Sequence, residues 1–125
     1  MKPDAPAPAP PATVFACGTA LDRLGAARPG EDATVVRLTC AGRLNAGMVL
    51  AAIESGADRV VVLGCDESSC RHENGPALAA GQACLARALL DLLGHDPARV
   101  TVELVDRAGS SRAASLEGTE PGAVA

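Results

Sequence analysis

The fold of this chain is decided by the stretch Arg59-Val60-Val61-Val62-Leu63-Gly64-Cys65-Asp66-Glu67-Ser68-Ser69-Cys70-Arg71-His72. It opens with a valine-rich apolar run that ends at a glycine and a cysteine, which is typical of a strand buried on both faces. A helix start follows at Gly75-Pro76. Because ligands and reactive groups collect at the carboxyl ends of parallel strands, Cys65 is predicted to lie at a functional edge.

Strands and helical segments alternate along the rest of the chain. Strands are predicted over about 13–17, 34–40, 59–64 and 100–105, and the polar alternation of the last one predicts a sheet edge. Helical segments are predicted over about 19–27, 46–55 and 76–93, with Asn45 as the N-cap of the second. The longest is expected to bury a stripe formed by Leu78, Leu85, Leu89 and Leu92. Right-handed crossovers then predict an α/β fold, a small three-layer parallel sheet of about four strands, flavodoxin-like or Rossmann-like.

Length and composition predict one domain with a tail at each end. The 125 residues divide into a Pro/Ala-rich flexible tail (1–12), an α/β domain (13–106) and a flexible or frayed C-terminal tail (107–125). The net charge of -4 and the near absence of aromatic residues argue against nucleic acid as a partner. No apolar run reaches the roughly 18 residues of a membrane span, and no secretory signal is present, so a cytoplasmic location is expected.

Four cysteines are predicted to meet at one edge of the sheet. Cys17 and Cys40 end the first two predicted strands, Cys65 ends the third, and Cys70 lies in the loop that follows. Soft thiolates select zinc or an iron–sulfur cluster. The intervening 22, 24 and 4 residues do not match a zinc ribbon and are compatible with a [2Fe–2S] cluster. The alternative is that these are packed thiols, which is the interpretation preferred for Cys84 in mid-helix.

Basic residues flank the predicted thiol site. Arg43 and Arg71 are candidate cofactor-binding residues, because nearby cations stabilise the reduced form of a thiolate cluster and raise its potential. Both could equally be solvated loop residues, and His72 is expected to be a surface histidine rather than a ligand.

A second chemistry fits the same stretch. The spacing from Cys65 to Arg71, between a strand and a helix, looks like the anion-binding loop of cysteine phosphatases and arsenate reductases, with Cys65 as the nucleophile. Asp66 and Glu67 count against it, because carboxylates within the loop would repel a phosphate. This alternative also gives Cys17 and Cys40 no role.

Several short motifs carry a resemblance to a known family. They are Phe15-Ala16-Cys17, Cys40-Ala41-Gly42-Arg43, Gly56-Ala57-Asp58, Val61-Val62-Leu63-Gly64-Cys65 with the spacing to Cys70, and Gly75. With these motifs the chain, from about 14 to 106, resembles the small iron–sulfur (delta) subunit of methyl-viologen-reducing, F420-non-reducing hydrogenase.

The resemblance implies a non-catalytic electron-transfer subunit. It implies a [2Fe–2S] cluster on the ligand positions Cys17, Cys40, Cys65 and Cys70. It also implies two partners, a hydrogenase or other electron donor and a heterodisulfide-reductase A-like flavoprotein. The chain departs from the family pattern at Ala20, where the family usually has a second cysteine, and at Ser68-Ser69 and Arg71-His72. A structural zinc domain or an apo adaptor domain remains the non-catalytic alternative.

Overall fold

A computed structural model describes residues 11–30, 32–70, 74–116 and 119 of the chain. Its principal elements are β1 (Ala12–Cys17), α1 (Gly18–Leu24), β2 (Ala33–Leu38), α2 (Ala46–Glu54), β3 (Arg59–Cys65), α3 (Gly75–Leu92), β4 (Val100–Val105) and β5 (Ser111–Ala113). Short 3-10 helices span Gly25–Ala27, Ala41–Arg43 and Pro97–Arg99. The predicted N-cap of α2 is confirmed, because the side chain of Asn45 accepts a hydrogen bond from the backbone N–H of Met48.

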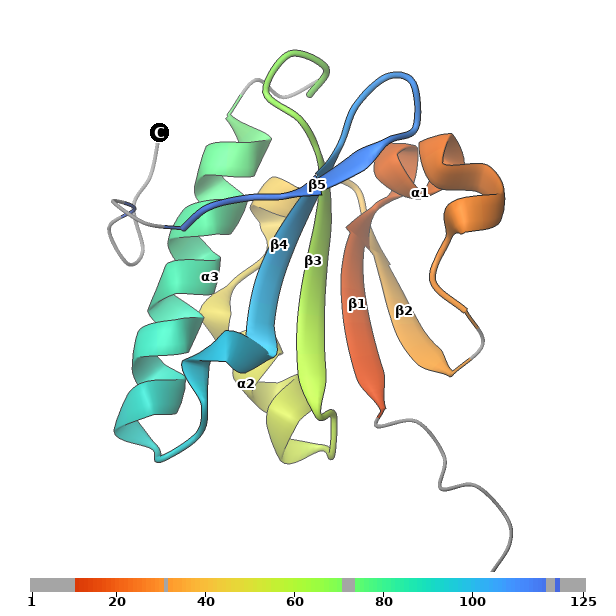
Figure 1. Cartoon of the computed structure of the whole chain (residues 1–125). Helices are drawn as coiled ribbons and strands as arrows, with labels where there is room; N and C mark the ends of the chain where they lie inside the picture. Colours follow the sequence, from red (N-terminus) through yellow and green to blue (C-terminus); the bar gives the residue numbers. More distant parts are fainter. Residues whose placement is uncertain (1–10, 31, 71–73, 117–118, 120–125) are drawn as a thin grey trace, which may run out of the picture.

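The sheet has the order β2-β1-β3-β4-β5. The first four strands are parallel, and β5 pairs antiparallel with β4. Helices α2 and α3 lie on one face of the sheet and α1 lies on the other, near the carboxyl ends of the strands (Figure 1). The predicted three-layer α/β architecture is confirmed. The chain reverses its direction across the sheet between β1 and β3, which is the position where open α/β sheets bind ligands.

The carboxyl-terminal part of the chain corrects two predictions. A tail was predicted over 107–125, but Ser111–Ala113 forms β5 and pairs with 103–105 of β4. The strand β4 is therefore not the edge that its alternating pattern predicted, because β5 covers its free side. All three residues of β5 are exposed, so the sequence carries no apolar signal for this strand.

Helix α3 buries a different stripe from the predicted one. Leu92 is 81% exposed, and Leu78, Leu85 and Leu89 are only partly buried. The fully buried positions are Ala79, Ala83, Ala86 and Leu90. The predicted and the observed stripe both have helical spacing, but three of the four residues of the observed stripe are alanines. Their small side chains let the helix lie close against β3 and β4, which a row of leucines would hold further away.

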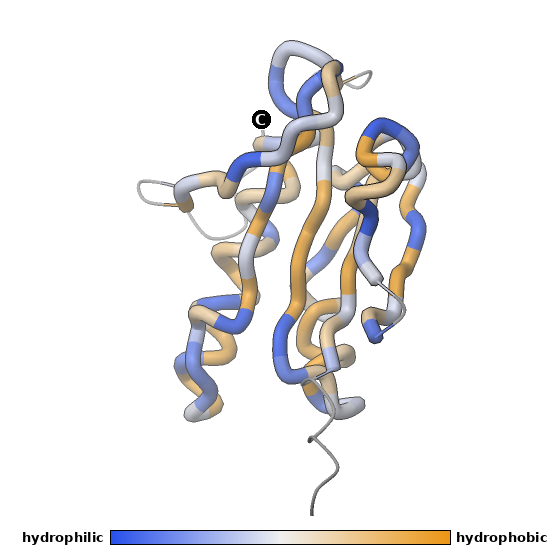
Figure 2. Tube along the Cα trace, turned by 45° about the vertical axis from the view of Figure 1, so that its right-hand side comes forward, coloured by the Kyte–Doolittle hydropathy of each residue, from blue (hydrophilic) through white to orange (hydrophobic). Residues whose placement is uncertain are grey.

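The core is centred on β3. Its residues 60–65 are all buried, and Figure 2 shows it as an apolar strand in the middle of the sheet. Among the helices in the described part of the chain, none is long and apolar enough to cross a membrane.

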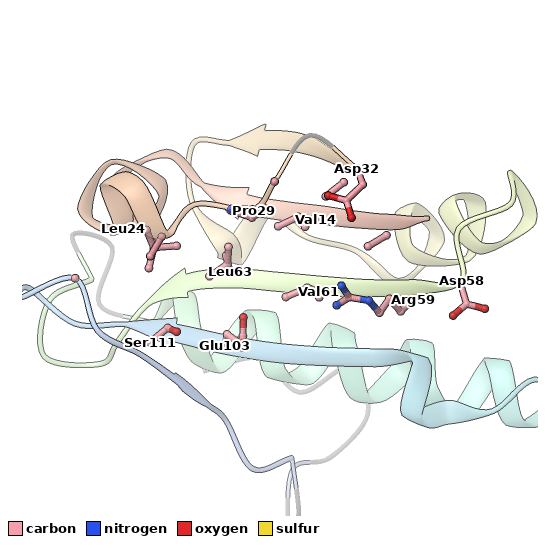
Figure 3. A pocket seen from close by; sticks show the side chains of 15 residues that line it. Val14, Leu24, Pro29, Asp32, Asp58, Arg59, Val61, Leu63, Glu103 and Ser111 are labelled. Carbon is pink, nitrogen blue, oxygen red and sulfur yellow. The ribbon is translucent and has the colours of Figure 1, made fainter. Parts of the chain in front are cut away.

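Helix α1 covers its face of the sheet only in part. A cavity of about 670 Å³ lies beside it, with Val14, Val61 and Leu63 on its floor and Asp32, Asp58 and Glu103 among its polar lining residues (Figure 3). This cavity contains none of the cysteines, so the predicted thiol chemistry has to be sought at the carboxyl edge of the strands.

Candidate metal centre

Two of the predicted thiols meet where the sheet changes direction. Cys17 is the last residue of β1 and Cys65 is the last residue of β3, and these strands are neighbours. Their Sγ atoms lie 3.8 Å apart in the interior of the protein. The crossover rules that place β1 beside β3 are therefore what bring together two cysteines separated by 48 positions in the sequence.

Cys40 reaches the same place from β2. The strand ends at Leu38 rather than at the cysteine, so the predicted strand over 34–40 is two residues too long. Cys40 instead precedes the 3-10 helix Ala41–Arg43, and its Sγ accepts a hydrogen bond from the backbone N–H of Gly42 at 3.4 Å. A Cβ at position 64 would lie 3.0 Å from the Cβ of Ala41. Because Gly64 has no side chain, the 3-10 helix Ala41–Arg43 can lie against β3.

Cys70 joins Cys40 at the start of α3. A Cβ built on Gly75 would lie 2.8 Å from the Sγ atoms of both cysteines, so the two sulfurs are at most twice that distance apart. Gly42 lies against the same glycine, with a built Cβ only 3.2 Å from Gly75 Cα. The two glycines of the sequence motifs thus leave room for a pair of sulfurs beside the helix start.

All four thiols line one small cavity. Its volume is about 100 Å³, and Thr19, Thr39 and Pro76 complete much of its wall. As the side chains stand, no three His, Cys, Asp or Glu residues of the described ranges surround a common metal-ion position. The arrangement is instead two thiol pairs facing one space. A set of four soft sulfur donors around a small cavity fits an iron–sulfur cluster or zinc by ligand chemistry.

Burial keeps two of these thiols protonated without a bound metal. Burial is the main reason why the pKa of Cys65 is raised to about 12, with further contributions from Cys17, while the positive charge of Arg23 acts in the opposite direction. Burial also raises the pKa of Cys40, against the hydrogen bond from Gly42. Metal binding at this site must therefore release thiol protons.

The predicted basic residues have different outcomes. Arg43 lies at the end of the 3-10 helix and lines a shallow cavity of about 200 Å³ that Cys40 also borders. Arg71 and His72 lie outside the described residues. Ala20, at the departure from the family pattern, is buried in α1 and does not line the four-cysteine cavity.

Cys84 lies apart from this site. It is buried on α3, and its Sγ donates to the carbonyl oxygen of Leu116 at 3.7 Å. Burial raises its pKa. The prediction of a packed core thiol agrees with this environment.

Sequence reasoning missed the arginine that contacts the thiol loop from α1. Arg23 donates to the hydroxyl of Ser69, a buried residue between Cys65 and Cys70 in the sequence. The two residues are 46 positions apart, and no local pattern links them, so only the fold could reveal the contact.

The geometry of the Cys65–Cys70 loop disfavours the anion-loop chemistry. An anion loop needs backbone N–H groups that point free toward the anion. Here the N–H of Asp66 donates to the carbonyl of Val105, and the N–H groups of Ser69 and Cys70 both donate to the carbonyl of Asp66. Three of the loop's amide donors are therefore already engaged within the protein.

A protein-family comparison covers the part of the chain that carries these thiols. The family model for the delta subunit of methyl-viologen-reducing hydrogenase matches residues 14–117, which include all four cysteines and β5. The chain belongs to this family. The match extends beyond the predicted domain boundary at 106, as expected if β5 is part of the fold.

Individual relatives support the same assignment. The chain is 35% identical over 88 residues to an iron–sulfur subunit of F420-non-reducing hydrogenase from Archaeoglobus profundus, an alignment that covers 69% of this chain and 64% of the relative. It is 34% identical over 95 residues to the vhu iron–sulfur subunit of the F420-non-reducing hydrogenase of Methanocaldococcus jannaschii, covering 74% and 71% of the two chains. The chain therefore spans about two thirds of the length of these relatives.

A third relative places a similar segment inside a larger protein. This relative is a subunit of the ferredoxin:CoB-CoM heterodisulfide reductase of Methanosarcina mazei. It is 31% identical over 78 residues, which cover 62% of this chain and 10% of that protein. A domain similar to this family thus occurs both as a separate chain and within a subunit of heterodisulfide reductase.

Proposed function

We propose that this chain is an electron-transfer subunit that holds one [2Fe–2S] cluster through Cys17, Cys40, Cys65 and Cys70. The observation that carries the proposal is the single cavity at the change of sheet direction, which four thiols from separate parts of the sequence line as two pairs. The names of the relatives support an iron–sulfur cofactor for the family.

The protein's own part is to position the thiols and enclose them. Cys17 and Cys65 end their strands, and Cys40 directly precedes the 3-10 helix that follows β2. The rigid sheet therefore sets the spacing of these three sulfurs. The N–H of Gly42 donates to Cys40, and such hydrogen bonds to sulfur are one means by which proteins set a cluster potential. A bound cluster would supply a one-electron carrier, with each electron entering from a donor and leaving to an acceptor while no bond of the protein is broken.

The proposed partners are a hydrogenase or other electron donor and a heterodisulfide-reductase A-like flavoprotein. The occurrence of a similar segment within heterodisulfide reductase subunits of Methanosarcina mazei and Methanosarcina acetivorans supports the second partner. As a separate chain, this carrier would dock on such a flavoprotein closely enough to pass electrons to it.

The proposal is tested by purifying the chain under anaerobic conditions and measuring iron, acid-labile sulfide and zinc. We expect about two irons and two sulfides per chain, and an EPR signal of spin one-half after reduction with dithionite. Colourless protein with about one zinc per chain would favour the structural zinc alternative instead. Protein that holds neither metal and resists cluster reconstitution would overturn the proposal.

A further inference from the structure

The loop between Cys65 and Cys70 has an internal turn of its own. The carbonyl of Asp66 accepts hydrogen bonds from the N–H groups of Ser69 and Cys70 at 3.1 and 3.0 Å. The carboxylate of Asp66 accepts from the hydroxyls of Ser68 and Ser69. These contacts shape the loop, but all of them lie within it and therefore do not fix it relative to the sheet.

Three arginines hold this loop from outside. Arg23 of α1 donates to Ser69 Oγ at 2.8 Å, Arg107 of the β4–β5 turn donates to the carbonyl of Ser68 at 3.4 Å, and Arg112 of β5 pairs with Glu67 at 2.9 Å. Three consecutive loop residues are thus each bound by an arginine from a different element. Sequence separations of 39 to 46 positions mean that the contacts exist only in the folded chain.

The contact of Arg23 is the most consequential of the three. Arg112 and Glu67 are both mostly exposed, and surface ion pairs of this kind contribute little. Ser69 is only 5% exposed, so its hydroxyl has little access to water as a replacement partner for the guanidinium. A charge-assisted hydrogen bond to a buried hydroxyl is the stronger kind.

The position of Arg23 is itself fixed by the β4–β5 turn. The carboxylate of Asp106 accepts from the N–H groups of Ala108 and Ser110, which closes the turn. Gly109 has a φ of +87°, and a Cβ there would collide with the carbonyl oxygen of Arg23. Glycine therefore lets the turn pack directly on the end of α1, next to the loop that Arg23 and Arg107 hold.

We propose that Arg23, acting through Ser69, is the positioning residue that holds the Cys65–Cys70 loop so that Cys70 faces the shared cavity. This inference rests on the proposed function in that Cys70 is taken as a cluster ligand. Arg107 and Arg112 give weaker support at the two preceding loop residues. The positive charge of Arg23 close to the thiols is also expected to make the cluster potential more positive.

The test compares Arg23→Gln, Arg23→Lys, Ser69→Ala and the double variant Arg23→Gln/Ser69→Ala in the full chain. Arg99→Gln is the matched control, because it removes an arginine whose ion pair with Asp58 lies away from the loop. Three properties are measured. They are amide hydrogen exchange of Ser69 and Cys70 in the metal-free protein, iron release to a ferrous chelator from the reconstituted protein, and the reduction potential of the reconstituted protein.

We expect Arg23→Gln to lower the protection of these two amides about tenfold and to speed iron release by a similar factor, and Ser69→Ala to do at least as much. The double variant should be no worse than Ser69→Ala, because Ser69→Ala already removes the contact that Arg23→Gln breaks, together with the hydrogen bond from Ser69 to Asp66. Arg23→Lys should recover part of the protection. The reduction potential should shift to more negative values in the two variants that lose the charge of Arg23, and not in Arg23→Lys or Ser69→Ala.

The two proposals fail in different ways. If the wild type holds iron and Arg23→Gln changes neither amide protection nor iron release beyond Arg99→Gln, the positioning role is overturned and the proposed function stands. If the wild type holds no iron but protection still falls in Arg23→Gln, the proposed function is overturned and the loop contact is supported. Additive effects in the double variant would also overturn the positioning role.

Discussion

The carboxyl edge of the sheet and the helix α3 both bury cysteine, but they surround it with different neighbours. At the edge, Cys17 and Cys65 face each other and share a cavity with Cys40 and Cys70. In α3, Cys84 follows Ala83, and its Sγ donates to the carbonyl oxygen of Leu116. Both environments exclude water, yet only the first brings sulfur to sulfur. The neighbours of a buried thiol, rather than its burial, indicate whether it can serve as a metal ligand.

Replacement of the cysteines is the strongest way to separate the two regions. Serine at position 17, 40, 65 or 70 should each reduce bound iron from about two per chain to near zero, because a [2Fe–2S] cluster needs four protein ligands. Cys84→Ser should keep the full iron content. Iron analysis of anaerobically reconstituted variants checks this. Loss of iron in Cys84→Ser alone would contradict the ligand assignment.

A methyl group at the helix start should also disturb the edge. Gly75→Ala places a Cβ 2.8 Å from both Cys40 Sγ and Cys70 Sγ, so these sulfurs must move. We expect faster loss of iron and a decrease of about 1–3 kcal/mol in the free energy of unfolding. Gly42→Ala should act in the same direction but less strongly, since its closest built contact is 3.2 Å. Iron retention equal to that of the wild type in Gly75→Ala would show that the two sulfurs do not need this space.

The interface of α3 should respond in stability and not in metal content. Leu90→Ala removes a side chain that is 1% exposed, and it should lower the free energy of unfolding by about 2–5 kcal/mol. Leu92→Ala, at 81% exposed, should stay within about 0.5 kcal/mol of the wild type. Urea unfolding of the metal-free protein gives both values. Equal destabilisation by the two variants would favour the leucine stripe predicted from the sequence.

The smallest effect is expected for the alkylation rate of Cys84, which should be the same with and without a bound cluster. Burial raises its pKa, and Arg87 opposes the shift only in part. Because the folded pKa lies above that of an unfolded thiol, folding favours the protonated form, and this contribution is lost as the pH rises through the folded value. Alkylation of Cys84 by iodoacetamide should thus be slow at about pH 8, below the usual thiol pKa, with or without iron, and fast in urea. Protection of Cys84 that appears only on loading would place it at the cluster.

The sequence was informative where a feature is local. The valine run predicted β3 and Asn45 predicted the start of α2, and the cysteines at the ends of β1 and β3 predicted the thiol edge. Parallel strands share a carboxyl edge, so strand ends alone were enough to bring these thiols together.

The sequence was uninformative where structure depends on distant polar contacts. The strand β5 has only exposed residues, and Arg23 meets Ser69 across 46 positions. The buried stripe of α3 was misassigned because leucines and alanines both recur with helical spacing, and hydrophobicity favours the leucines. Packing against the sheet favoured the smaller residues instead.

The central claim is that the four thiols at the edge together bind one cluster, and native mass spectrometry of the anaerobic protein tests it most directly. We predict that the wild type and Cys84→Ser each carry the added mass of two irons and two sulfides, less four thiol protons, and that Cys65→Ser carries none. A wild type with the mass of the bare chain or of a single added zinc, or a Cys65→Ser variant that keeps the full added mass, would contradict the claim.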